Sequence, residues 1–190
     1  MKVNDLEYFV KNINPPIIGF IGVVGSGKDY NANRVMSIDP SYKKYSFADE
    51  VRDFVWLALG WEPKNNEEYE LFKLTKIEFG NMSLRGRDML INVGNGLRQK
   101  DPDVWINYWL KKIPSSFKNE KVVVSDVRYY NEVKAIHGLG GKVIFCDYRS
   151  DKYNDKINSE SERMSQKLIS LGYDDMTVLD PLYMSENITY

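Results

Sequence analysis

A lysine directly follows a group of glycines at the end of an apolar run. The run Ile17–Val23 contains Gly22 and is followed by Gly25, Gly27 and Lys28, which fits the spacing G-x-x-x-x-G-K. Glycines at this spacing allow a backbone turn whose N–H groups point inward at an anion. The positive end of the following helix and the lysine ammonium would then face the β and γ phosphates of a nucleotide. The alternative is a glycine turn with a structural role only.

We therefore expect this phosphate-binding loop, or P-loop, to bind ATP, with Lys28 as a catalytic residue. Asp29 stands where Ser or Thr usually gives a hydroxyl to magnesium, so its carboxylate is a candidate metal ligand. The predicted ATP-binding residues of the loop are Gly22, Gly25, Ser26, Gly27, Lys28 and Asp29.

A second carboxylate lies near the end of another apolar run. Lys121–Val127 contains three consecutive valines and predicts a buried strand with Asp126 near its carboxyl end. An acid at that place beside a phosphate loop can hold magnesium directly or through water. We expect Asp126 to be a catalytic residue and a metal ligand, the alternative being an acid that only caps the next helix.

Arginines supply further positive charge. Arg128 lies two residues past Asp126, whereas Arg85, Arg87 and Arg98 fall on or beside one predicted helix. The planar guanidinium suits a phosphate because it donates two hydrogen bonds at once. We expect Arg128 to be catalytic and to hold an acceptor phosphate, with help from Arg87 and Arg98. Arg149, just past a later strand, is a candidate ATP-binding residue. For each of them a solvated surface charge is the alternative.

Other conspicuous residues receive structural interpretations. His137 falls near a helix C-terminus, where a cation is stabilising by itself. Cys146 lies in an apolar stretch and is expected to be a buried small side chain. Trp105 and Trp109 share one helix face and are expected to be mostly core, although Trp105 could border the base of an acceptor nucleotide.

Composition limits the classes of function. The chain has 190 residues, 43% of them hydrophobic and 28% charged, with a net charge of −1. These values are ordinary for a globular domain and give no broad basic field for a nucleic-acid polymer. The N-terminus carries Asp5 and Glu7 where a signal peptide has an apolar core, and no apolar run is long enough to cross a bilayer. We expect a cytoplasmic protein with no membrane partner.

Strands and helices are predicted to alternate along the chain. Strands are expected at 17–23, 43–47, 121–127, 142–147 and 177–179, and helices at 2–14, 27–37, 48–59, 67–80, 85–98, 103–113, 131–139 and 159–171. The alternation predicts an α/β fold with a mostly parallel sheet between helical layers, the three-layer fold of P-loop NTPases. Ligands of such sheets bind at the carboxyl ends of the strands.

The whole chain, 1–190, is expected to form one kinase-like domain with two additions. Residues at about 48–113 would form a helical insertion that binds the acceptor. The polar segment at about 149–165 would form a lid over the phosphates.

Four stretches of the sequence resemble the bacteriophage deoxynucleoside monophosphate kinases, relatives of adenylate and dephospho-coenzyme A kinases. They are Gly22…Ser26-Gly27-Lys28-Asp29, Ser46-Phe47-Ala48-Asp49, Arg87-Asp88-Met89-Leu90-Ile91-Asn92-Val93-Gly94…Arg98…Asp101…Trp105, and Asp126-Val127-Arg128-Tyr129-Tyr130-Asn131-Glu132. The resemblance covers about 17–149, and its third and fourth stretches are the specific ones.

The resemblance implies a division of labour among these residues. Lys28 would lie at the triphosphate of ATP and Asp126 at magnesium or the acceptor. The substrate-binding residues would be Arg87, Arg98, Asp101, Trp105, Arg128 and Glu132. The implied cofactors are ATP and Mg²⁺, the implied substrate is a deoxynucleoside monophosphate, and the implied location is the cytoplasm, that of the host if a phage encodes the protein. A homodimer is an option.

We therefore expect a kinase that transfers the γ-phosphoryl group of ATP to a deoxynucleoside monophosphate. Two alternatives stay open. The first is a kinase of another small molecule, such as dephospho-coenzyme A or a nucleoside, for which Asp126 could act as the base. The second is a nucleotide-binding module without turnover, which the missing Ser or Thr after Lys28 favours.

Overall fold

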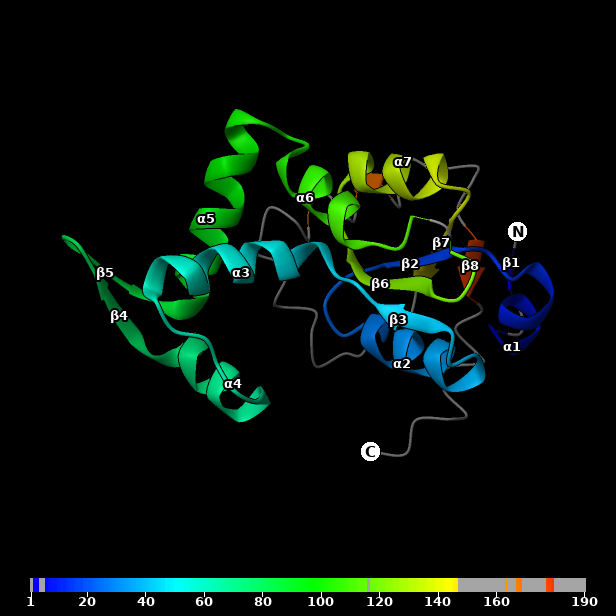
Figure 1. Ribbon diagram of the computed structural model, residues 1–190, viewed down its shortest axis with the longest axis horizontal. Coiled ribbons are helices and arrows are strands. Elements are labelled where there is room, and N and C mark those ends of the chain that lie inside the picture. The colour runs from blue at the N-terminus through cyan, green and yellow to red at the C-terminus, as the bar shows by residue number, and fades with distance from the viewer. Residues whose placement is uncertain are drawn as a thin grey trace. The chain divides into compact units, whose positions relative to one another are not determined.

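The chain divides into two compact units in the computed structural model (Figure 1). One unit joins Met1–Ser46 with Lys112–Tyr190, and the other is Phe47–Lys111. The structure describes residues 2–3, 6–115, 117–146, 163, 167–168 and 177–179. The predicted ATP ligand Arg149 and, apart from Arg163, the predicted lid at about 149–165 lie outside the described residues.

The first unit is built on a six-stranded sheet with the order β1-β8-β7-β2-β6-β3. Its strands are β1 (Lys2–Val3), β2 (Ile17–Ile21), β3 (Tyr42–Lys44), β6 (Lys121–Val127), β7 (Lys142–Cys146) and β8 (Thr177–Leu179). All five strand pairings in this sheet are parallel. Every residue of β2 is buried, as expected for a central strand covered on both faces.

Helices cover both faces of this sheet. On one face, Ile18 and Phe20 of β2 share a core with Val35 of α2 (Lys28–Ile38). On the other, a Cβ atom added to Gly19 would touch Ile136 of α7 (Tyr130–Gly138) at 2.8 Å. Figure 1 shows α2 and α7 on opposite sides of the strands. The unit is therefore an α/β structure with a mostly parallel sheet between helices, as the sequence predicts at that level.

Strand β6 slips by one residue against β2 near its carboxyl end. Gly19 pairs with Val124, but Ile21 pairs with Val127, so β6 contains one residue more than β2 over this stretch. Such a bulge reverses the alternation of side chains between the two faces. Val127 accordingly points to the α7 face, where its Cγ2 atom would lie 3.0 Å from a Cβ atom added to Gly19.

The N-terminal segment differs from the predicted helix at 2–14. Lys2–Val3 forms β1, which pairs with Val178–Leu179. The helical part is α1 (Leu6–Tyr8) followed by a π-helical turn, η1 (Phe9–Ile13). The strand was not predictable from local periodicity because its partner lies more than a hundred residues away in the sequence.

The second unit contains four helices and one hairpin within Phe47–Lys112. The helices are α3 (Phe47–Leu59), α4 (Asn66–Leu74), α5 (Gly86–Lys100) and α6 (Val104–Lys112), and the strands are β4 (Lys76–Phe79) and β5 (Met82–Arg85). Its core gathers around Val55, Phe72 and Met89. The last residue of α6, Lys112, is counted with the first unit.

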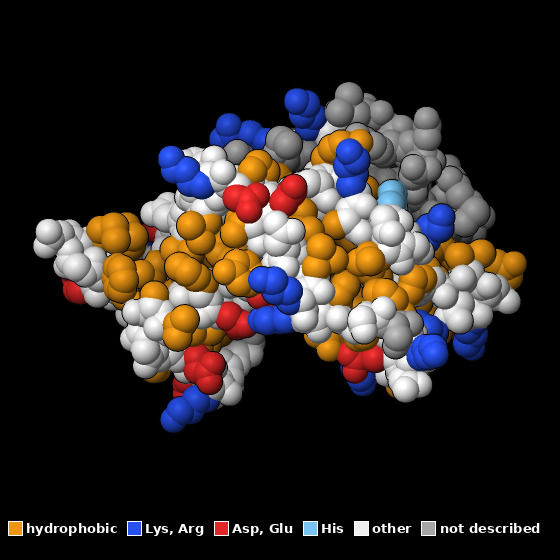
Figure 2. Space-filling view, turned by 45° about the horizontal axis from the view of Figure 1, so that its top comes forward, with side chains coloured by type: hydrophobic (Ala, Val, Ile, Leu, Met, Phe, Trp, Pro, Cys, Tyr) orange, Lys and Arg blue, Asp and Glu red, His pale blue; other side chains and the backbone are white. Residues whose placement is uncertain are grey.

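The hairpin corrects the prediction of one helix over 67–80. Helix α4 ends at Leu74, and β4 pairs with β5 in antiparallel register. Gly80, with φ of 59°, takes the first position of a two-residue turn, which requires positive φ. Hydrophobic side chains gather at the surface of this hairpin, at the left of Figure 2, where Phe79 is 38% and Met82 49% exposed.

None of the helices in the described part of the chain is both long and apolar enough to span a membrane.

Candidate functional site

The glycine-rich loop connects the end of β2 to the start of α2. Gly25 and Gly27 have φ of 77° and 80°, in the left-handed region that favours glycine. Gly22 is constrained by space instead, because a Cβ atom there would lie 2.4 Å from Ser26 Oγ and 2.7 Å from the carbonyl oxygen of Cys146. The three glycines thus allow a tight loop that a side chain at these places would disturb.

Ser26 lies inside this loop. Its backbone N–H donates to the carbonyl of Val23 at 3.2 Å, and the residue is completely buried. Among the described residues its Oγ atom has no hydrogen-bond partner. Burying a hydroxyl without a partner costs free energy, so the loop carries a polar group that a ligand could satisfy.

The side chain of Lys28 folds back over the loop. Its Nζ donates to the carbonyl oxygens of Gly22 at 2.7 Å and Val23 at 2.6 Å. These contacts hold the ammonium on the loop rather than in bulk solvent. The start of α2, where backbone N–H groups lack helical acceptors, lies at the same residue.

Asp29, in the first turn of α2, accepts two hydrogen bonds on one oxygen. Lys44 Nζ lies 2.6 Å and Ser125 Oγ 2.7 Å from Asp29 Oδ1. Partial desolvation tends to raise the pKa of this carboxyl, although the side chain is largely exposed. The hydrogen bonds from Lys44 and Ser125 and the charges of Lys44 and Lys28 outweigh this effect. The pKa of Asp29 therefore lies below its ordinary value, and the side chain is an anion at neutral pH.

Asp126 and Arg128 lie at the same edge of the sheet as the glycine loop. Ile21, the last residue of β2, pairs with Val127 of β6, so Gly22 and Arg128 follow at neighbouring strand ends. Asp126 and Arg128 are both half-buried. The parallel register thus brings the predicted carboxylate and arginine to the strand end where the loop begins.

Glu132 stabilises the turn that carries Arg128. Its Oε2 accepts hydrogen bonds from the backbone N–H groups of Arg128 at 2.7 Å and Tyr129 at 3.0 Å. The side chain is only 2% exposed. These contacts cap the start of α7, so the structure gives Glu132 a positioning contact, while substrate binding by Glu132 stays a prediction.

The second unit holds the other predicted acceptor-binding residues. Arg87 is exposed and Arg98 half-buried, at opposite ends of α5. Eleven residues apart, they lie on the same helix face but about 16 Å apart along the axis. Asp101 Oδ1 accepts from the backbone N–H of Asp103 at 3.0 Å, which shapes the turn into α6.

Trp105 is a core residue in this unit. It is 2% exposed, and its indole N–H donates to the carbonyl of Gly94 at 2.9 Å. Trp109 is equally buried, against Phe47 at 4.6 Å between ring centroids. The expectation that both tryptophans are mostly core is confirmed, and contact of Trp105 with an acceptor base stays a prediction.

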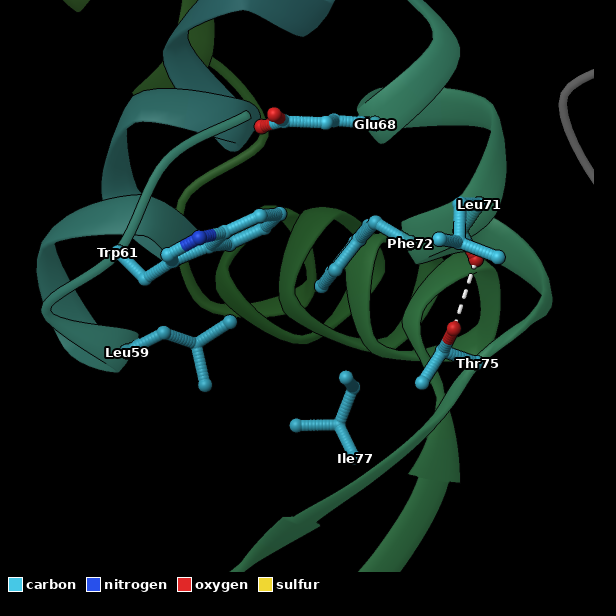
Figure 3. A pocket seen from close by; sticks show the side chains of 7 residues that line it. All are labelled: Leu59, Trp61, Glu68, Leu71, Phe72, Thr75 and Ile77. Carbon is cyan, nitrogen blue, oxygen red and sulfur yellow. Dashed lines mark hydrogen bonds between the residues drawn. The ribbon is translucent and has the colours of Figure 1, made fainter. Parts of the chain in front are cut away.

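The second unit also contains an apolar hollow of about 340 Å³ (Figure 3). It is lined by Leu59, Trp61, Glu68, Leu71, Phe72, Thr75 and Ile77. The Thr75 hydroxyl donates to the carbonyl of Leu71 at 2.8 Å, so it is already satisfied within the chain. None of the predicted site residues lines this hollow.

Lys44 and Ser125 were missed in the sequence. A lysine at the end of a short edge strand looks like a solvated charge, and Ser125 is masked by the more conspicuous Asp126 beside it. Their contact with Asp29 depends on the neighbouring positions of α2, β3 and β6, which only the sheet order reveals.

No protein-family model matches the chain, and neither does any curated protein with which its sequence was compared.

Proposed function

We propose that this chain is a P-loop kinase that transfers the γ-phosphoryl group of ATP to a deoxynucleoside monophosphate, with Mg²⁺ as cofactor. One observation carries the proposal. A tight glycine loop, with Lys28 folded over it, precedes helix α2 at the carboxyl end of β2. The neighbouring strand β6 brings Asp126 and Arg128 to the same end of the sheet. Phosphoryl transfer needs positive charge around the phosphates, a metal and an aligned acceptor.

The loop fits a triphosphate in two respects. The absence of side chains at Gly22, Gly25 and Gly27 lets an anion approach the backbone, and the buried Ser26 hydroxyl has no partner among the described residues. Lys28 would exchange its contacts with loop carbonyls for contacts with phosphate oxygens. Catalysis would then consist of positioning and charge neutralisation, with no covalent enzyme intermediate.

The residues also fit a magnesium ion. Asp29 and Asp126 offer hard oxygen ligands at the phosphate loop, and such sites hold magnesium with one or two carboxylates together with substrate phosphates. Within the described residues no group of three or more His, Cys, Asp or Glu side chains is placed to hold a metal ion by itself. The metal would neutralise charge on the phosphates, while Arg128 would hold the acceptor phosphate by its planar fork.

A second candidate function is a nucleotide-binding module without turnover. The contact of Asp29 with Lys44 favours it, because the carboxylate that would hold magnesium already has a cationic partner. A kinase of dephospho-coenzyme A or of a nucleoside is a third candidate, and no contact among the described residues gives it specific support. Cytoplasmic location and a homodimer stay predictions.

One incubation separates these functions. The protein is mixed with ATP and Mg²⁺ and, separately, with deoxynucleoside monophosphates, ribonucleoside monophosphates, nucleosides and dephospho-coenzyme A, and products are separated by chromatography. We expect ADP and a nucleoside diphosphate with monophosphates only. Product with another acceptor identifies the other kinase, ATP binding without product supports the module, and absence of ATP binding refutes all three.

A matched pair of lysine variants assigns any activity to the loop. Lys28→Ala should lower turnover by about 10² to 10³, judged from the loss of single preorganised charges at other sites. Lys11→Ala is the control, because Lys11 is exposed and, among the described residues, its side chain pairs only with Glu7. Equal turnover of the two variants would mean that the activity does not come from this loop.

A further inference from the structure

Asp29, Ser125 and Lys44 form a small cluster of hydrogen-bonded side chains. Both donors contact the same oxygen, Oδ1 of Asp29. In the described residues, Oδ2 of Asp29 accepts no hydrogen bond, and the side chains of Lys44 and Ser125 make no other one. The carboxylate therefore has one satisfied oxygen and one that can still take a ligand.

Three elements bring the cluster together. Asp29 comes from the first turn of α2, Lys44 from the end of β3, and Ser125 from β6, where the strand slips by one residue. Ser125 is only 4% exposed, so its hydroxyl is fixed in place, whereas the Lys44 side chain is 36% and the Asp29 side chain 73% exposed. The cluster thus combines an immobile hydroxyl with a cation that can leave toward solvent.

The cluster contains a hydroxyl group, which the loop lacks at the position after Lys28. The position after Lys28 usually gives a hydroxyl to magnesium, and here it is Asp29. The hydroxyl reappears 2.7 Å from that carboxylate on the neighbouring strand, as Ser125 Oγ. A carboxylate and a hydroxyl are both hard oxygen ligands of the kind that magnesium prefers.

We propose that Asp29 and Ser125 form the cation position of the nucleotide site and that the ammonium of Lys44 occupies this position as an internal cation until a nucleotide-bound divalent metal displaces it. The inference rests on the proposed function, since it needs a triphosphate in the loop. Lys44 neutralises Asp29 in the metal-free protein. With ATP bound, Asp29 and Ser125 would hold the metal, which would supply positive charge to the phosphates, and Lys44 would turn outward.

Displacing the Lys44 ammonium from Asp29 requires little free energy. An exposed ion pair contributes little to stability, because water solvates both charges and two flexible side chains lose freedom. A lysine ammonium is strongly hydrated, so its release to solvent is compensated. A divalent ion would be attracted to the carboxylate and to the phosphate oxygens more strongly than the singly charged ammonium of Lys44 is.

The test measures ATP affinity by isothermal titration calorimetry, in excess Mg²⁺ and in EDTA. The ratio of the two dissociation constants, EDTA over Mg²⁺, reports how strongly the metal assists binding. Lys44→Met should raise this ratio at least threefold, because metal-free ATP loses a nearby cation while the metal loses a competitor. Asp29→Asn should bring the ratio close to one, and Ser125→Ala should lower it at least twofold.

Lys43→Met is the matched control, since Lys43 is exposed on the same strand and has no partner in the described residues. It should keep the wild-type ratio. Circular dichroism melting of each variant checks that the fold is retained. A lower ratio in Lys44→Met would mean that Lys44 only positions Asp29 for the metal, and an unchanged ratio that it is a surface ion pair. Either result overturns the inference.

The same data separate this inference from the proposed function. If the wild type binds ATP with the expected ratios but phosphorylates no acceptor, the cation position stands and the kinase does not. If acceptors are phosphorylated and the ratios do not change, the kinase stands and the internal cation does not. A wild-type protein that binds no ATP under either condition overturns both.

Discussion

The carboxylate of Glu132 accepts a hydrogen bond from the backbone N–H of Arg128 at 2.7 Å, and one from Tyr129 at 3.0 Å. Two amide groups at the start of α7 thus depend on one buried oxygen. The phosphate contact that we propose for Arg128 needs a fixed backbone, and the contact with Glu132 supplies it.

Glu132→Ala should therefore lower the free energy of unfolding by about 2 to 4 kcal/mol, because a helix cap is lost and two N–H groups lose their acceptor. Urea denaturation measures this. Glu132→Gln keeps one oxygen in place and should recover about half of the loss. If Glu132 acts through Arg128, both variants should raise the acceptor KM more than the ATP KM. Equal changes would indicate a purely structural role.

Arg128→Lys tests the assignment of this residue to the acceptor. The substitution keeps the charge but removes the planar fork, so we expect a rise of at least tenfold in the acceptor KM or a similar fall in turnover. ATP affinity measured without acceptor should hardly change. Loss of ATP binding with an unchanged acceptor KM would move Arg128 to the donor side, and a silent substitution would leave it a partner of neighbouring charges.

Gly22→Ala tests whether the loop must be tight. The added Cβ would lie 2.4 Å from Ser26 Oγ and 2.7 Å from the backbone oxygen of Cys146, so the loop must shift. ATP affinity should fall at least tenfold. The control is Gly96→Ala in α5, where nothing lies within 4 Å of the new atom. That variant should gain up to about 1 kcal/mol of stability from helix propensity and leave ATP affinity unchanged.

The buried thiol of Cys146 should make the protein less stable at alkaline pH. Burial raises the pKa of its thiol from 9.0 to about 12, against smaller opposing effects of Lys28 and Asn31. Above pH 9 the unfolded chain releases this proton and the folded chain keeps it. The free energy of unfolding should therefore fall with rising pH by up to about 1.4 kcal/mol per unit on this account.

The check compares wild type with Cys146→Ala by chemical denaturation between pH 7 and 10.5. The stability difference between the two proteins should be constant below pH 9 and shift above it in favour of the alanine variant. A difference that stays constant to pH 10.5 would mean that the thiol ionises as readily in the folded protein as in the unfolded one.

Local sequence signals predicted most of the elements. The strand Lys121–Val127 was expected with its observed bounds because a run of valines flanked by polar residues leaves little choice. The same reasoning was wrong for the hairpin, because it predicted one helix over 67–80, whereas Gly80-Asn81 forms a two-residue turn between β4 and β5. The alternation of Ile77 and Phe79 before it is the signal that could have identified β4.

The sequence predicted the site residues that lie at the ends of individual strands, but not the contacts between side chains from different elements. The glycine spacing identified Lys28, and the parallel sheet accounts for Asp126 and Arg128 near it. Lys44 and Ser125 reach Asp29 through the sheet order and the slip in β6, and neither leaves a periodic signal in the sequence. The contact of Glu132 with the backbone N–H of Arg128 was likewise not predicted, because it depends on the geometry of the turn into α7.

The pairing of β1 with β8 has a consequence for biosynthesis. Lys2 pairs with Val178, so the first unit cannot complete its sheet until residue 178 has been made, whereas Phe47–Lys111 is one continuous stretch. At about 5 to 20 residues per second, β2 waits on the order of 5 to 20 s on the ribosome before β6 is synthesised. During that time the wholly apolar Ile17–Ile21 lacks both neighbouring strands. We expect this segment to be the part of the nascent chain most in need of chaperone protection.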